Sequence, residues 1–173
     1  MALIPALSHR ERENERVGVE KEPAAMTDLL QSGSRAPDFT LAATGEQTFT
    51  LSALAGQKHI VLVFYVGDNT PDCNRQLASL RDDASELAGL DVVVVGVNPA
   101  STADHERYST QLGLSYPLLS DVGGQVASQY GALNADRSVQ RSVYVVDKAG
   151  IIRFAARGMH WTPEFYEALA SLE

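Results

Sequence analysis

From residue 32 onward, unbroken apolar runs alternate with amphipathic stretches. Residues 60–66 (IVLVFYV) and 92–97 (VVVVGV) are mostly β-branched runs, which are typical of strands buried on both faces. The apolar positions between the two runs recur at helical spacing: Leu77, Leu80, Ala84 and Leu87. A strand, a helix and a second strand at this spacing predict a βαβ unit with parallel strands.

Helix start and stop signals follow the second apolar run. Ser101 and Asp104 form a pair similar to a capping box, and the helix that they begin is predicted to end before Gly113. A short helix is expected over residues 124–130. Both helices lie after the βαβ unit and before the next apolar segments.

The C-terminal part of the chain predicts a hairpin and a closing helix. Strands 142–146 and 151–155 are joined by residues 147–150 (DKAG), a turn signal, and Thr162 begins the last helix. A further short hairpin pairs two upstream segments, 38–42 and 46–51. This order of elements predicts an α/β fold of the thioredoxin-like type, with a central mixed β-sheet flanked by helices.

Residues 1–31 differ from the rest of the chain. They are mixed in charge and poor in β-branched and aromatic residues, so we interpret them as a flexible N-terminal tail before one domain over residues 32–173. The segment has no secretory h-region, and no apolar run in the chain reaches membrane-spanning length. A cytoplasmic location without a membrane partner is therefore expected.

Composition narrows the function classes. The 173 residues suit one domain, and 14 Lys and Arg against 22 Asp and Glu give a net charge of −8. An acidic chain of this kind is a poor partner for a phosphate backbone, so no nucleic-acid partner is expected. The single cysteine, Cys73, excludes an intramolecular disulfide and a multi-cysteine zinc site. No phosphate-binding loop or metal-ligand cluster is present, so no cofactor is predicted.

The loop after the first buried run contains the candidate chemistry. Thr70 is a good N-cap and Pro71 suits the first helical position, which places Cys73 in the first helical turn. Free backbone N–H groups and the helix dipole favour a thiolate there. Asp72 opposes this effect and Arg75 supports it. The alternative is a structural cysteine, since cysteine is among the most buried residue types.

Residues 64–73 (FYVGDNTPDC) resemble the active-site segment of peroxiredoxins of the AhpC/TSA superfamily, especially the bacterioferritin-comigratory type. Three further segments resemble the family in order and spacing: 33–41, 116–121 and 141–150. The resemblance covers roughly residues 32 to 173 and implies a thioredoxin-like fold and thiol-dependent peroxidase activity.

The resemblance implies a catalytic set of Cys73, Thr70 and Arg141. The Cys73 thiolate would attack a peroxide, either hydrogen peroxide or an organic hydroperoxide, and become a sulfenic acid. Thr70 would hold the peroxide in line, and Arg141 would stabilise the thiolate and the charge developing on the oxygens. For Arg141, the alternative is a surface salt bridge.

Two positions depart from the family pattern. Val66 occupies the place of the family proline, which shields the site, and Ala78 stands where many relatives have a resolving cysteine. With one cysteine, turnover requires an external thiol reductant: thioredoxin, a glutaredoxin-like protein or a small thiol. The assembly is expected to be a monomer or a homodimer. Val66 supports an alternative function, a binding or redox-sensing protein with weakened catalysis.

Two other thiol chemistries are alternatives. A Cys-His-Asn hydrolase would need a histidine beside Cys73, but His105 and His160 lie in no recognisable motif and are predicted to be surface or loop residues. A dithiol reductase needs a second cysteine, and Thr70 occupies its place. Trp161, before the last helix, is predicted to be a packing residue or a dimer contact.

Overall fold

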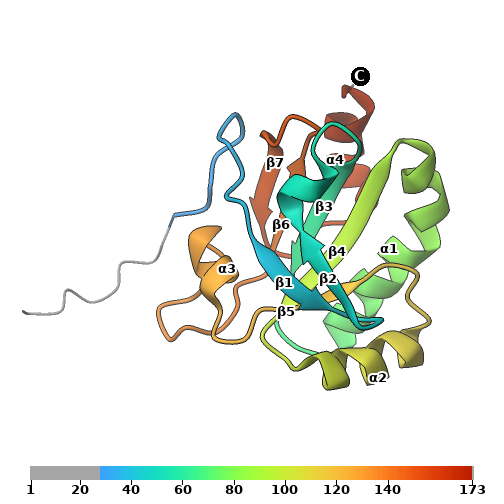
Figure 1. Cartoon of the computed structure of the whole chain (residues 1–173), viewed down its shortest axis with the longest axis vertical. Helices are drawn as coiled ribbons and strands as arrows, with labels where there is room; N and C mark the ends of the chain where they lie inside the picture. The colour runs from blue at the N-terminus through green and yellow to red at the C-terminus, as the bar shows by residue number, and fades with distance from the viewer. Residues whose placement is uncertain (1–27, 173) are drawn as a thin grey trace, which may run out of the picture.

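The computed structural model describes residues 28–172, which form a seven-stranded mixed sheet with helices on both faces (Figure 1). The strands are β1 Thr40–Ala43, β2 Gln47–Thr50, β3 His59–Phe64, β4 Val92–Asn98, β5 Leu118–Ser120, β6 Ser142–Val146 and β7 Ile152–Arg157. The helices are the 3-10 helix η1 Leu51–Leu54 and the α-helices α1 Pro71–Gly89, α2 Thr102–Leu112, α3 Gln125–Gln129 and α4 Thr162–Ala170.

The strand order is β2-β1-β5-β4-β3-β6-β7. Strand β3 runs parallel to β4 and antiparallel to β6, and β7 pairs antiparallel with β6. The predicted βαβ unit, both hairpins and the mixed sheet are thereby confirmed. Since every residue of β3 is buried, the strand lies in the middle of the sheet, as its unbroken apolar sequence indicates.

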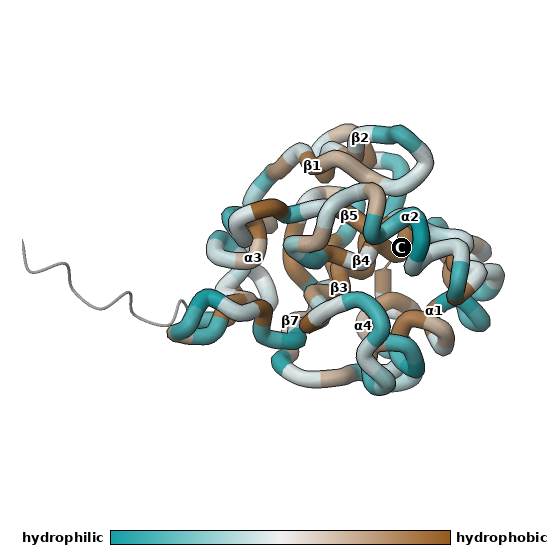
Figure 2. Tube along the Cα trace, turned by 90° about the horizontal axis from the view of Figure 1, so that it is seen from below, coloured by the Kyte–Doolittle hydropathy of each residue, from teal (hydrophilic) through white to brown (hydrophobic). Residues whose placement is uncertain are grey.

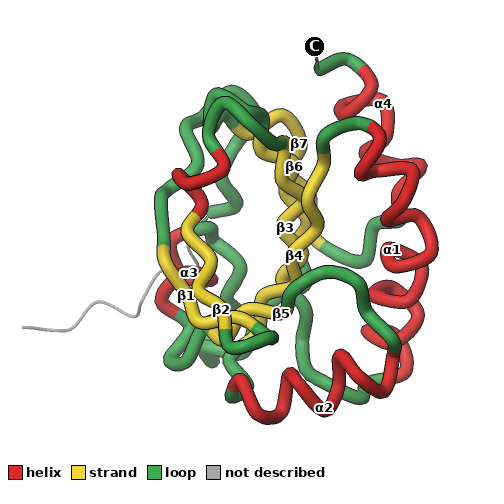
Figure 3. Tube along the Cα trace, turned by 45° about the vertical axis from the view of Figure 1, so that its right-hand side comes forward, coloured by secondary structure: helices red, strands yellow, loops and turns green. Residues whose placement is uncertain are grey.

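The two faces of β3 belong to two hydrophobic cores. Ile60, Leu62 and Phe64 pack toward α3 and the N-terminal hairpin, whereas Val61 and Val63 pack toward α1, α2 and α4. Figure 3 shows these three helices on one side of the sheet and α3 on the other. Figure 2 shows hydrophobic strands in the interior and hydrophilic stretches around them. The site-bearing helix α1 is therefore held against a buried sheet.

Strand β5 is absent from the sequence-based prediction. It has three residues, too few to show a period, and it pairs parallel with β4 and antiparallel with β1. A close approach makes Gly96 necessary here, because a Cβ atom at this position would lie 2.7 Å from Leu118 Cδ2. The same Cβ would lie 3.2 Å from the ring of Tyr65, which packs directly over Gly96.

The N-terminal tail predicted for residues 1–31 falls mostly on residues 1–27, which lie outside the described residues. Within the described part, Leu29 and Leu30 pack against the core, and the Leu30 amide donates to the Tyr144 hydroxyl at 3.2 Å. Among residues 28–172, no helix combines the length and the apolar character that crossing a membrane requires.

Candidate active site

The loop between β3 and α1 places Cys73 at the start of a long helix. Thr70 is the N-cap of α1, and its Oγ1 accepts a hydrogen bond from the Cys73 amide at 3.4 Å. Pro71 occupies the first helical position, as the sequence predicts. The Cys73 side chain has no exposed surface. The sulfur therefore lies in a dry first helical turn, where the positive end of the dipole favours negative charge.

Arg141 reaches the Cys73 sulfur from the residue before another strand. It directly precedes β6, whose first residue, Ser142, pairs with Phe64 at the end of β3. This register brings residues separated by 68 positions together, so that Arg141 Nη2 lies 3.6 Å from Cys73 Sγ. The Arg141 side chain is 22% exposed, so most of it is buried, and it contacts the sulfur as well as forming an ion pair with Asp72.

The carboxylate of Asp72 pairs with both Arg141 and Arg75. Asp72 Oδ2 lies 3.6 Å from Arg141 Nη1, and Asp72 also pairs with Arg75. The hydrogen bond and charge of Arg75, with a smaller contribution from Arg141, hold the pKa of Asp72 below its ordinary value. The sequence predicts that Arg75 supports the thiolate, but in the structure Arg75 pairs with Asp72. Arg141 is the cation that contacts the sulfur.

The prediction that His105 is a surface or loop residue is wrong. His105 lies in α2 and is completely buried, with its ring bonded to Asp68, Tyr65 and the Asn98 carbonyl. The sequence around it is polar, so the single inward-facing stripe of α2 is not evident from apolar spacing alone. His160, by contrast, lies in the loop before α4, as predicted, with a partly exposed side chain.

Further polar side chains that the sequence did not single out surround the first turns of α1. The Tyr108 hydroxyl donates to Asn74 Oδ1 at 2.6 Å, and the buried Gln76 Nε2 donates to the His160 carbonyl at 3.2 Å. Burial raises the pKa of Tyr108, so its phenol remains protonated. A tyrosine at helical spacing from a histidine is the only sequence signal for this arrangement.

The two departures from the peroxiredoxin pattern lie on either side of Cys73. Val66 is in the loop after β3 and is 47% exposed, although it is an apolar residue. Ala78 lies in α1 and is half-buried, with no thiol to offer. Cys73 is a free cysteine.

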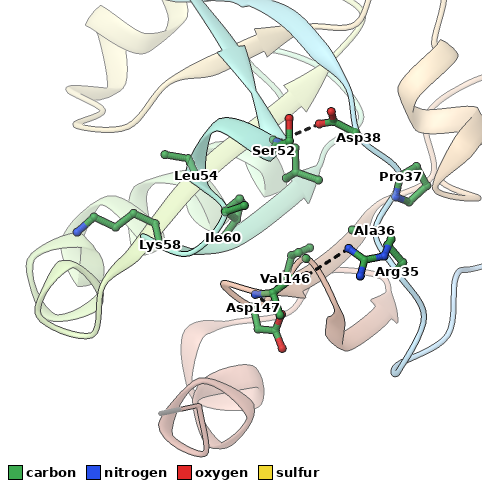
Figure 4. Close-up of a pocket in the computed structure, with 14 residues that line it drawn as sticks. Arg35, Ala36, Pro37, Asp38, Ser52, Leu54, Lys58, Ile60, Val146 and Asp147 are labelled. Atoms are coloured by element: carbon green, nitrogen blue, oxygen red, sulfur yellow. Dashed lines mark hydrogen bonds between the residues drawn. The ribbon is translucent and has the colours of Figure 1, made fainter.

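A cavity of about 430 Å³ lies away from this site (Figure 4). It is lined by Ile60 at the beginning of β3, whereas Cys73 follows the end of the same strand. The charged side chains around the cavity bond within the protein; for example, Lys58 pairs with Asp91 at 3.0 Å. Among the described residues, no group of three His, Cys, Asp or Glu side chains could hold a metal ion.

Comparisons with known proteins agree on one family. Residues 32–155 match the AhpC/TSA family. The alkyl hydroperoxide reductase E of Mycobacterium tuberculosis is 37% identical over 130 residues, covering 73% of this chain and 85% of that protein. A peroxiredoxin bcp of Coxiella burnetii is 31% identical over 130 residues, covering 71% of this chain and 85% of that protein.

A solved structure shows the same fold. The crystal structure of the peroxidoxin BcpB from Mycobacterium tuberculosis superposes with a TM-score of 0.74 at 27% sequence identity, covering 82% of this chain and 95% of that one. The mixed sheet, the strand-to-helix loop with its cysteine and the sequence matches have one explanation in common. The chain belongs to the AhpC/TSA family of peroxiredoxins, which are thiol-dependent peroxidases.

Proposed function

We propose that this peroxiredoxin works with Cys73 as its peroxidatic cysteine and with Thr70 and Arg141 as its catalytic partners. The observation that carries the proposal is the 3.6 Å contact between Arg141 Nη2 and Cys73 Sγ at the capped start of α1. A guanidinium beside a sulfur in a dry helical turn stabilises the thiolate, which is the nucleophilic form.

In the oxidative step, the Cys73 thiolate attacks one oxygen of the peroxide and the O–O bond breaks. The sulfur becomes a sulfenic acid, and the other oxygen leaves with the electron pair, takes a proton and departs as water or an alcohol. Negative charge grows on the leaving oxygen. Arg141 supports this charge, and its Nε is buried without a hydrogen-bond partner among the described residues, so the guanidinium has a donor to spare.

Thr70 orients the peroxide. Its hydroxyl lies at the N-cap, accepts from the Cys73 amide and can donate its own proton to a peroxide oxygen. A peroxide held by this hydroxyl would lie at the same helix end as the sulfur, where proximity and alignment lower the barrier.

The reductive step uses an external thiol, because Cys73 is the only cysteine in the chain. One thiol condenses with the sulfenic acid, releasing water and forming a mixed disulfide. A second thiol then releases the Cys73 thiolate and a disulfide. Since the sulfur is completely buried, the chain around it must move to admit the peroxide and, in the next step, the thiol. Thioredoxin, a glutaredoxin-like protein or a small thiol each fits this chemistry.

Both hydrogen peroxide and organic hydroperoxides are proposed as substrates. The name of the mycobacterial relative, an alkyl hydroperoxide reductase, supports the organic class. The half-exposed apolar side chain of Val66, in the active-site loop, supports it too. The cytoplasmic location and the state of assembly remain predictions from the sequence.

Peroxide consumption in the presence of excess dithiothreitol tests the proposal. The wild-type protein should consume both hydrogen peroxide and cumene hydroperoxide, and Cys73→Ser should consume neither. Cys73→Ser keeps the size and hydrogen bonding of the side chain, so the fold should be retained. Activity that survives in this variant would remove Cys73 from the nucleophile's role.

A further inference from the structure

A buried hydrogen-bonded group holds the active-site loop from behind. The His105 Nδ1 atom lies 3.1 Å from Asp68 Oδ2 and 3.2 Å from the Tyr65 hydroxyl, which itself donates to Asp68 Oδ1 at 2.8 Å. On the other side of the ring, Nε2 lies 3.4 Å from the Asn98 carbonyl oxygen. The group joins α2, the end of β4 and the loop after β3.

Two hydrogen bonds hold the Asp68 carboxylate. The Tyr65 hydroxyl donates to Asp68 Oδ1, and burial, followed by the Asp68 charge, raises the pKa of Tyr65 so that the phenol stays protonated. A carboxylate oxygen only accepts, so the 3.1 Å contact between Asp68 Oδ2 and His105 Nδ1 assigns a hydrogen to Nδ1. His105 Nε2 faces the Asn98 carbonyl oxygen at the longer distance of 3.4 Å.

Asp68 is the point at which this group meets the site. It precedes Thr70 by two residues, and the intervening Asn69 has a left-handed backbone with φ of 62°. Asparagine adopts this conformation more readily than other residues that have a side chain, so Asn69 makes a tight turn between Asp68 and Thr70. Anchoring Asp68 on one side, while α1 begins at Thr70 on the other, leaves the loop little freedom.

The same face of α2 holds the helix that carries the cysteine. Tyr108 lies one turn after His105 and donates to Asn74, the residue that follows Cys73. Asn98 closes the arrangement, because its side-chain amide donates to the Tyr65 carbonyl at 3.0 Å. Helix α2 therefore contacts the chain on both sides of the reactive sulfur.

We propose that His105 is a positioning residue of the peroxidatic site: its ring contacts with Asp68 and with the Asn98 carbonyl tie Asp68 to α2 and β4 and so hold Thr70 in place before Cys73. The proposal rests on the proposed function. It predicts a specific loss in the reaction with peroxide, which needs the ordered loop. Alkylation of the same thiol by iodoacetamide makes no use of the Thr70 hydroxyl.

The test compares two reactions of Cys73 in the same variants. His105→Phe fills the space but donates no hydrogen bond, and Asp68→Asn removes the carboxylate that accepts from Tyr65 and faces His105. Each should slow single-turnover oxidation by hydrogen peroxide about 10-fold to 100-fold, the order expected for a misplaced reacting group. The plateau rate of iodoacetamide alkylation at high pH should not fall, because a looser loop gives the reagent no less access to the buried sulfur. His105→Gln, which keeps one donor, should lie between His105→Phe and the wild type.

His160→Phe is the matched control. This histidine also contacts a carboxylate, Glu164, and a backbone carbonyl, that of Arg157, but it lies in the loop before α4. Its loss should change neither rate. If His105→Phe is oxidised at the wild-type rate, or if oxidation and alkylation fall by the same factor, the positioning role is overturned.

A second measurement remains valid if His105→Phe fails to fold. The ¹⁵N spectrum of the wild-type histidine rings should show a hydrogen on Nδ1 of His105, and an unprotonated Nδ1 would overturn the assignment of the Asp68 hydrogen bond. This result does not depend on peroxide chemistry. By contrast, wild-type Cys73 that reacts with peroxide no faster than a free thiol would overturn the proposed function while the ring spectrum still tests the hydrogen-bonding arrangement.

Discussion

The guanidinium of Arg141 and the sulfur of Cys73 meet at 3.6 Å, although 68 positions separate them in the chain. The antiparallel pairing of β3 with β6 produces the contact, because it sets the residue before β6 beside the loop that follows β3. A rigid, fully buried strand pair thus fixes one cation over one sulfur. This contact between Arg141 and Cys73 favours the thiolate more directly than the charged residues next to Cys73 in the sequence do.

Loss of the Arg141 guanidinium should slow the peroxide reaction strongly. Arg141→Ala should lower the second-order rate of Cys73 oxidation by about 10²- to 10³-fold, the range seen when a donor to developing charge is removed. Arg141→Lys should restore part of the rate, since it keeps the charge but cannot contact both Sγ and Asp72 with a planar fork. Stopped-flow fluorescence measures both variants.

Arg153→Ala is the control for this experiment. Arg153 lies on β7, away from Cys73, and pairs with Asp147. Its side chain is half-exposed. Its removal should leave oxidation unchanged. An Arg141→Ala protein that reacts as fast as the Arg153→Ala protein would exclude Arg141 from the mechanism.

Thr70 caps α1 and is proposed to orient the peroxide. A variant that removes the cap of another helix, α2, separates these two roles. Thr70→Ala should lose the cap of α1, at about 1 kcal/mol of stability, and should also slow oxidation by about 10-fold or more. Ser101→Ala loses the equivalent cap of α2, where Ser101 accepts from the Asp104 amide at 3.2 Å. Urea unfolding should give similar losses for both variants, with only Thr70→Ala impaired in oxidation. Equal oxidation rates in the two variants would show that Thr70 acts only as the N-cap of α1.

Restoring the family proline at position 66 should improve the enzyme. Among residues 28–172 the Val66 amide makes no backbone hydrogen bond, so a proline at this position would break none. Val66→Pro should stabilise the fold by about 0.4–1 kcal/mol through the unfolded state and should raise the oxidation rate by shielding the site. A lower rate with an unchanged fold would show that valine is adapted to this site.

The Asp147 carboxylate predicts sensitivity to acid. Burial opposes its ionisation, but hydrogen bonds from the Ile151 amide and Arg153 outweigh this and hold the pKa of Asp147 below its ordinary value. A carboxyl with a lowered folded-state pKa stabilises the fold above its unfolded pKa of about 3.9, and this contribution is lost as the pH falls through the folded pKa.

Asp147→Asn should therefore cost about 1.5–3 kcal/mol near neutral pH, the amount expected for hydrogen bonds to a charged group. The difference between the variant and the wild type should shrink as the pH is lowered below the unfolded pKa. Urea unfolding at a series of pH values measures it. A difference that stays constant down to strong acid would contradict the assignment of an ionised Asp147.

The sequence predicts the elements of this fold well where their patterns are long. The unbroken runs at β3 and β4 and the caps at Thr70 and Ser101 are local signals that dominate their segments. Strand β5 is not predicted, because three residues are too few to show an alternating hydrophobic pattern. Its position depends on tertiary pairing with β4 and β1.

The site is predicted less completely than the fold. The positions of Thr70 and Cys73 follow from the strand-to-helix junction, whereas Arg141 enters only through the family resemblance, since β3–β6 pairing is non-local. The burial of His105 is likewise missed, because it too depends on non-local contacts. Its burial is set by the loop and strand end that α2 covers, and a polar helix sequence does not reveal which of its polar side chains turns inward.

Stopped-flow oxidation of the reduced protein by hydrogen peroxide, with sulfenic acid trapped by a dimedone-type reagent, tests the central claim most directly. We predict rapid reaction and stoichiometric trapping on Cys73, with the rate strongly reduced in Arg141→Ala. Oxidation no faster than that of a free thiol would contradict the account and favour a binding or redox-sensing protein whose catalysis was weakened by Val66.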